Sequence, residues 1–377
     1  MESIPFRLLT YNTMLLVPAP LRYNGCEERS VRIAHEVYNN IAEVDVICLQ
    51  EVVKNAKSVV NSFSRHPYRT RPMRSSIFSS KIRFWPSGLF VVSSHPIVEE
   101  RQLVFTGPGY HADKYASKGL VYVKLYVEKM GSFVHVINVH LNAWYTPEAC
   151  AARSSQVQQV SQFIEKMDIK GDEPLFVAGD FNIDLHTHRS ECEEVASQLG
   201  CEIVPFDKVD FSVNPSINKF VGTDAPEQYT SHLKDSECYQ SIIEGRGCPC
   251  CSMELLDMAM IRKGFYTFNS AKAGVVRLRS SFPFHANKNV FTKDVGYELS
   301  DHFPVLVETS WTPQDATSTR EEYHRCTTRR VVVDGEFSWH FFGVFLCVVI
   351  PFFLILYYIL SSIFPKKRGL LWLRKQY

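Results

Sequence analysis

Short apolar runs recur along most of the chain, and they limit what it can fold into. They occupy residues 6–12, 45–51, 88–94, 118–127, 133–140, 174–180, 255–261 and 302–309. Runs this short, rich in β-branched and aromatic residues, are typical of buried strands. Helical spacing appears in residues 27–43, and again from Thr146, a predicted N-cap followed by Pro147, to about Met167. Many strands with few helices indicate an α/β fold, a four-layer sandwich of two packed mixed β-sheets with outer helices.

Polar residues stand at the ends of most of these runs. They are Asn12, Glu51, His140, Asp180 with Asn182, Asp257, and Asp301 with His302. Strand ends on one edge of a sandwich can converge, so we predict that these residues form one pocket. Oxygen ligands suit Mg²⁺, and the absence of Cys from the set disfavours a soft metal. Two histidines beside a hard cation suit hydrolysis of a phosphate ester, one accepting and one donating a proton.

The stretch FVAGDFN at 176–182 has two explanations. Residues two apart share one face of a strand, so Asp180 and Asn182 are expected to point the same way, toward a bound group. Asn and Asp are also common in turns, so a strand followed by an Asx turn explains the same letters.

Five blocks of the sequence resemble the signature blocks of the endonuclease/exonuclease/phosphatase superfamily. They are QEV at 50–52, NVHLNA at 138–143, GDFN at 179–182, LDMAMI at 256–261 and SDHFPV at 300–305, in the expected order. Two further stretches, DKYASKGLVYVKL at 113–125 and SINKF at 216–220, are similar to segments of the neutral sphingomyelinase and inositol phosphosphingolipid phospholipase C family.

The resemblance implies a Mg²⁺-dependent phospholipase C that hydrolyses sphingomyelin, or an inositol phosphosphingolipid, to ceramide and a phosphorylated head group. When the functional residues of the family are assigned to the matching positions of this sequence, the resemblance implies roles for three groups of residues. The metal ligands would be Glu51, Asn12 and Asp301, the residues holding the scissile phosphate would be Asp180 and Asn182, and the catalytic residues would be His302, Asp257 and His140. In this scheme His302 is the general base, Asp257 orients it, and His140 protonates the leaving group or stabilises the pentavalent state.

Three other functions are weighed against this one. A nuclease of the same superfamily needs a cationic groove, but Lys plus Arg number 41 against 40 for Asp plus Glu, so no nucleic-acid partner is expected. An inositol-phosphate phosphatase needs a cluster of Lys and Arg that the sequence does not reveal. A catalytically inactive membrane scaffold is disfavoured by the intact set of polar strand ends.

The C-terminal part predicts an attachment to a membrane. Residues 339–364 form a stretch of 26 without a charged side chain, about 39 Å if helical, which is long enough to cross a bilayer. We expect a catalytic domain over residues 1–309, a linker over 310–338, a single transmembrane helix over 339–364 and a basic tail over 365–377. The basic tail favours a cytosolic C-terminus. The lack of a signal sequence favours instead an endomembrane such as the ER, with the catalytic domain in the cytosol.

Three other features are given their simpler explanations or left open. The eleven Cys show no framework beyond CPCC at 248–251, and they are expected to be free thiols of a reducing compartment. His186 and His188 are expected in a surface loop rather than on zinc. The phenylalanines of residues 282–291 either pack in the core or form a loop that enters the membrane interface.

Overall fold

The computed structural model describes residues 3–16, 25–73, 85–107, 109–214, 217–218, 253–262, 268–285, 295–312 and 330–334. The predicted membrane span, the basic tail, the CPCC cluster and Phe291 lie outside these ranges. Within the described ranges, no helix is both long and apolar enough to cross a membrane.

One mixed sheet carries the N-terminal strand near its centre. Its strand order is β11-β14-β1-β2-β4-β3. The strands are β1 (Ile4–Leu15), β2 (Val46–Val52), β3 (Tyr68–Arg69), β4 (Phe90–Ser93), β11 (Phe268–Val275) and β14 (Val305–Trp311). β1 runs parallel to β2 and antiparallel to β14, so the ends of β1 and β2 lie at the same edge as the start of β14.

A second mixed sheet has the order β15-β5-β6-β7-β8-β10-β9. Its strands are β5 (Ile97–Val104), β6 (Gly119–Val127), β7 (Ser132–His140), β8 (Leu175–Asp180), β9 (Glu202–Ile203), β10 (Asp257–Arg262) and β15 (Arg330–Asp334). β7 and β8 are parallel and β8 and β10 antiparallel, which aligns the end of β7, the end of β8 and the start of β10. A separate pair, β12 (Arg279–His285) and β13 (Val295–Glu298), forms a two-stranded sheet.

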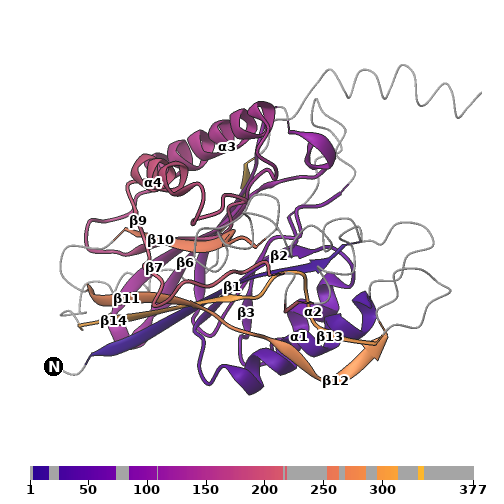
Figure 1. Cartoon of the computed structure of the whole chain (residues 1–377). Helices are drawn as coiled ribbons and strands as arrows, with labels where there is room; N and C mark the ends of the chain where they lie inside the picture. Colours follow the sequence, from indigo (N-terminus) through magenta and orange to yellow (C-terminus); the bar gives the residue numbers. More distant parts are fainter. Residues whose placement is uncertain are drawn as a thin grey trace, which may run out of the picture. The chain divides into compact units, whose positions relative to one another are not determined.

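The helices lie outside the two sheets, as predicted (Figure 1). They are α1 (Cys26–Asn40) and α2 (Ala56–Ser62) beside the first sheet, and α3 (Pro147–Lys166) and α4 (Arg189–Gln198) beside the second, with short 3₁₀ turns η1 (His111–Tyr115) and η2 (Glu128–Met130). Alternation along β1 explains the layers: Phe6 and Leu8 face the core between the sheets, whereas Leu9 and Tyr11 pack with the buried face of α1. The predicted α/β fold of two packed mixed sheets is therefore confirmed.

The expected linker over residues 310–338 differs from the structure at both ends. β14 continues to Trp311, whose side chain is buried. Arg330–Asp334 form β15, which pairs in parallel with β5 at the edge of the second sheet. Three consecutive valines favour a strand, even within a polar, Arg-rich surrounding. These residues therefore belong to the sheets, and the rest of the expected linker lies outside the described part of the chain.

Candidate active site

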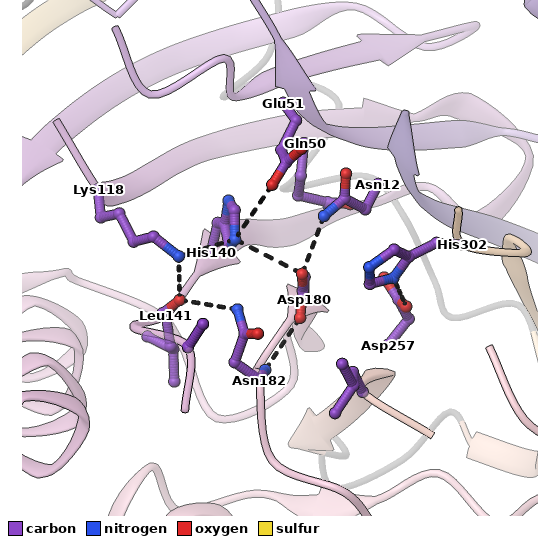
Figure 2. Close-up of polar contacts among 12 residues, drawn as sticks. Asn12, Gln50, Glu51, Lys118, His140, Leu141, Asp180, Asn182, Asp257 and His302 are labelled. Carbon is purple, nitrogen blue, oxygen red and sulfur yellow. Dashed lines mark hydrogen bonds and ion pairs between the residues drawn. The ribbon is translucent and has the colours of Figure 1, made fainter. Parts of the chain in front are cut away.

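Three adjacent strands of the second sheet bring His140, Asp180 and Asp257 together. In the register of the sheet, Asp180 at the end of β8 lies opposite His140 of β7 on one side and opposite Asp257 of β10 on the other. Asn12 comes from β1 of the facing sheet, and its side-chain amide donates a 2.9 Å hydrogen bond to Asp180 Oδ2 (Figure 2). Polar residues from both sheets thus meet at one edge of the sandwich, as the strand ends predicted.

Asp180 and Asn182 form both a turn and part of the site. The backbone amide of Asn182 donates to Asp180 Oδ1 at 2.9 Å, which is the Asx turn, and Asn182 adopts a left-handed backbone with φ 53°. Its side-chain amide donates to the carbonyl of Leu141 at 2.9 Å. A Cβ on Gly179 would lie 2.0 Å from the carbonyl oxygen of Val139, so only glycine lets β8 approach β7 this closely. The Asx turn is therefore confirmed, and the holding of a bound group by Asp180 and Asn182 stays a prediction.

Glu51 reaches the site through a break in the strand. Its φ of 58° departs from the extended backbone of β2, and Gly88 makes room for this bend, because a Cβ there would lie 2.8 Å from Glu51 C. The preceding residue, Gln50, points between the sheets and donates to Asn138 Oδ1 at 2.7 Å. Asn138 in turn donates to the backbone carbonyls of Leu49 and Phe90, each at 2.9 Å. The sequence analysis did not assign a role to Gln50 or Asn138, although both are polar residues inside the QEV and NVHLNA blocks.

Lys118 is a further site residue that the sequence reasoning did not assign. Its side chain is buried, and its ammonium lies 2.9 Å from His140 Nε2 and 3.0 Å from Asp113, and donates to the carbonyl of Leu141. Burial, together with the charge of Lys118, lowers the pKa of His140 to about 3. A neutral His140 that accepts from Lys118 fits the predicted role of stabilising a charged intermediate better than that of donating a proton.

His302 and Asp257 form a second short side-chain contact of the site. His302 Nδ1 lies 2.6 Å from Asp257 Oδ2, and both side chains are buried. Burial disfavours the charged imidazolium, but the carboxylates of Asp257 and Asp301 outweigh it and raise the pKa of His302 well above its usual value. Ser212, which the sequence reasoning also missed, supports the pair: its hydroxyl accepts from the amide of Asp257 at 3.3 Å, and its carbonyl accepts from the amide of Phe303 at 2.7 Å.

The loop before β14 is bonded to the end of β1, to the SINKF block and to α1. The Ser300 hydroxyl lies 2.7 Å from the carbonyl of Asn12 and 3.1 Å from Asp301 Oδ1. Asn218, from the SINKF block, donates to the carbonyls of Ser300 and Asp301 at 2.9 and 3.1 Å. Arg29 of α1 is also buried here, and its guanidinium donates to the carbonyls of Thr13, Met14 and Leu299. All eight predicted site residues therefore belong to one connected region.

The charges of this region suit a divalent cation. Burial raises the pKa of Glu51 to about 7, with the carboxylates of Asp301 and Asp180 adding to the effect, so these acidic groups repel one another. A bound cation would relieve that repulsion, and the oxygens of Glu51, Asn12 and Asp301 are the donors that Mg²⁺ prefers. The site therefore fits a hard metal ion.

Another group of side chains that could hold a metal ion differs from the predicted ligand set. Asp180, Asp257 and His302 offer atoms that all lie within 4.8 Å of one another. Two of these three residues are already joined by the 2.6 Å contact between His302 and Asp257. We therefore keep this pair apart from the metal and retain Glu51, Asn12 and Asp301 as the predicted ligands.

His186 and His188 do not converge on a shared ligand position. His186 Nε2 lies 2.8 Å from the carbonyl oxygen of Asp210, and the ring of His188 stacks on Tyr145 at 4.2 Å between centroids. Both imidazoles thus have local contacts that explain them. Cys26, Cys48, Cys150, Cys192 and Cys201 are free thiols.

Residues 9–191 match the model of the Endonuclease/Exonuclease/phosphatase family. Sphingomyelinase C of Bacillus cereus is 28% identical over 256 residues, covering 62% of this chain and 75% of that protein. The crystal structure of sphingomyelinase C from Streptomyces griseocarneus superposes with a TM-score of 0.63 and 25% identity over 81% of this chain and 99% of that one. A mutant of beta toxin from Staphylococcus aureus with bound magnesium ions has the same fold, with a TM-score of 0.63 and 22% identity over 81% and 99% of the two chains.

Proposed function

Because this chain belongs to the endonuclease/exonuclease/phosphatase family and is a phosphodiesterase, we propose that it is a Mg²⁺-dependent phospholipase C acting on sphingomyelin. Water would attack the phosphorus and give up a proton, the bond between phosphorus and the ceramide oxygen would break, and that oxygen would take up a proton from solvent, so that phosphocholine and ceramide leave. The observation that carries this proposal is the placing of two different histidine pairs on either side of Asp180: His302 with Asp257, and His140 with Lys118 (Figure 2).

Each pair has one chemical task in this scheme. Asp257 holds Nδ1 of His302, which leaves Nε2 to take the proton from the attacking water. Asp180 and the amides of Asn12 and Asn182 would position the phosphate and the water beside it. The ammonium of Lys118 would stabilise the charge that develops on the ceramide oxygen, with neutral His140 relaying that interaction. When bound, Mg²⁺ supplies neutralisation of the phosphoryl charge and lowers the proton affinity of His302.

The proposal includes attachment to a membrane. We infer that residues 339–364 span the bilayer and leave the catalytic domain on the cytosolic side of an endomembrane, where it meets the lipid head groups. The two phenylalanines described in β12 differ: the side chain of Phe282 is 70% exposed, whereas Phe284 is buried at 3%. Phe284 is therefore part of the core, and Phe282 remains a candidate for entering the membrane interface.

The proposal is tested by substrate choice. Full-length protein is given sphingomyelin, inositol phosphoceramide, DNA and inositol phosphates in Mg²⁺, with an EDTA control. Sphingomyelin should be hydrolysed fastest, and His302→Ala should lower its turnover by about 10²–10⁴. His95→Ala is the matched control, because His95 also contacts an aspartate, Asp45 at 2.9 Å, outside the site. Preferential cleavage of DNA, or full sphingomyelin turnover in EDTA, would overturn the proposal.

A further inference from the structure

Exposed aromatic side chains gather beside the His140 end of the site. Trp85 is 46% exposed, Tyr115 39% and Trp144 57%. They come from three separate segments: the residues before β4, the η1 turn, and the loop between β7 and α3. With His111 we call them the aromatic rim. Exposed aromatic groups of this size mark interaction surfaces when they are clustered.

The rim is held together through η1. The rings of Trp85 and Tyr115 meet edge-on with centroids 6.3 Å apart, and the backbone amide of Trp85 donates to the carbonyl of Tyr115 at 3.2 Å. At the other end of η1, the ring of His111 meets Trp144 with centroids 5.6 Å apart. One short turn therefore carries both halves of the rim, so the four side chains belong to a single surface.

The same turn is bonded to the catalytic machinery. Asp113, in the middle of η1, accepts a 2.7 Å hydrogen bond from the amide of Ala143 and lies 3.0 Å from the ammonium of Lys118. Lys118 in turn contacts His140 at 2.9 Å. The aromatic rim is thus linked to His140 through two polar contacts, Asp113 to Lys118 and Lys118 to His140. How deeply the rim enters a surface that it binds would therefore determine how deeply Lys118 and His140 lie in that surface.

The chemistry of the rim points to the polar layer of a bilayer. Trp and Tyr combine an apolar ring with a hydrogen-bonding group, and such residues concentrate at the level of lipid head groups. A positive charge accompanies them, because the ammonium of Lys114 lies 4.8 Å from the centre of the Tyr115 ring. Cationic groups near the surface are attracted to anionic lipids.

We propose that the aromatic rim is a membrane-contact surface that seats the His140 end of the site in the head-group layer. This inference rests on the proposed function, since a lipid phosphodiester lies in that layer and the catalytic groups must reach it there. Phe282 is in β12, whose partner strand β13 leads through Ser300 to His302. The rim and Phe282 therefore belong to different sides of the site, and contact at both would orient the pocket toward the bilayer.

The test compares variants of the full-length chain reconstituted in vesicles of phosphatidylcholine, phosphatidylserine and sphingomyelin. The measured quantity is the ratio of turnover on these vesicles to turnover on a water-soluble short-chain sphingomyelin. For Trp85→Ser/Trp144→Ser the ratio should fall about tenfold, equivalent to about 1.4 kcal/mol. Tyr68→Ser is the matched control, since Tyr68 is 39% exposed, like Tyr115, but lies in β3. An unchanged ratio in the double variant would overturn the inference; Tyr115→Ser replaces it if the double variant does not fold.

A second measurement separates this inference from the proposed function. Brominated phospholipids in vesicles without sphingomyelin should quench the fluorescence of the parent protein more than that of Trp144→Phe, because Trp144 contacts the lipid. Equal quenching in the two proteins would mean that Trp144 stays in water or faces a protein partner, and it would refute the membrane contact. If no sphingomyelin is hydrolysed but quenching differs as expected, the proposed function fails and the membrane contact stands.

Discussion

Arg29 offers the sharpest test of how the fold assembles the site. Its side chain is fully buried in α1, and its guanidinium donates to the carbonyls of Thr13 and Leu299 at 2.8 Å and of Met14 at 2.7 Å. Thr13 directly follows Asn12, and Leu299 lies two residues before Asp301. The guanidinium therefore joins two of the strand ends that are predicted to hold the metal, and we expect its loss to separate them.

The magnitude follows from the three hydrogen bonds. A hydrogen bond to a charged group contributes about 1.5–3 kcal/mol, so Arg29→Met removes a gross stabilisation of several kcal/mol. Part of it is offset, because burial lowers the pKa of Arg29, which shows that burying the charge is itself unfavourable. We expect a net loss of about 3–5 kcal/mol in the free energy of unfolding, because three backbone carbonyls lose their hydrogen-bond donor and each unsatisfied group costs about 1–3 kcal/mol. Arg29→Lys keeps the positive charge but not the planar guanidinium with its several donors, so we expect a smaller loss in the free energy of unfolding than for Arg29→Met.

The assay pairs thermal unfolding with the Mg²⁺ concentration that gives half-maximal activity. Val37→Ala is the control, since Val37 is buried on the same helix and its truncation should cost about 2 kcal/mol without touching the site loops. Arg29→Lys should raise the half-activating Mg²⁺ concentration about tenfold, whereas Val37→Ala should leave it unchanged. If both variants lose stability and neither changes the Mg²⁺ requirement, Arg29 stabilises the fold alone and the reasoning is refuted.

Three further predictions concern the ionisable groups. The raised pKa of Glu51, about 7, means that its carboxylate takes up a proton as the pH falls through 7, so Mg²⁺ affinity measured by calorimetry should weaken about tenfold from pH 8 to pH 6; equal affinities would contradict this. Asp257→Asn should lower kcat by about 10²–10⁴-fold with little change in KM, because His302 loses the carboxylate that orients it. A kcat close to that of the parent protein would refute the assignment of His302 as the general base. Lys118→Met should raise the pKa of His140 in an NMR titration, since a repelling charge is removed; an unmoved pKa would exclude that contact.

The sequence predicted eight of the strands, and the strands that carry the site were simple cases. β8 is apolar up to its last residue, Asp180, and β7 carries apolar residues at five of its nine positions and ends on His140, so the sequence indicated both the strands and their polar ends. Pro147 after Thr146 likewise identified the start of α3, where the Thr146 hydroxyl accepts a bond from the amide of Ala149 at 3.3 Å. Predicting that strand ends converge needed only the assumption of a sandwich, and the register of β7, β8 and β10 then aligned His140, Asp180 and Asp257.

The supporting residues could not be predicted, since their partners are distant in sequence. Lys118 and His140 are 22 residues apart, Gln50 and Asn138 88 apart, and Arg29 and Leu299 270 apart. Alternation gives the face of a strand on which a side chain lies, but not which residue of the opposite sheet it meets. β15 was missed for a different reason: its pairing with β5 joins residues more than two hundred positions apart, and its surroundings are polar.

The residues that depart from local rules are those on which the site depends. Glu51 and Asn182 hold left-handed backbones, which cost a non-glycine residue of order 1–3 kcal/mol, and Lys118 is an ammonium with almost no access to solvent. Such costs persist only where neighbouring contacts fix the geometry. At Glu51 the geometry is fixed in two ways. Gly88 leaves room for the bend, and the hydrogen bond from the Gln50 side chain to the Asn138 side chain joins β2 to the opposite sheet. The inter-sheet amides therefore do more than satisfy buried polar groups: they hold the carboxylate of a strained residue toward Asp180 and His140, where an unstrained strand would have turned it away.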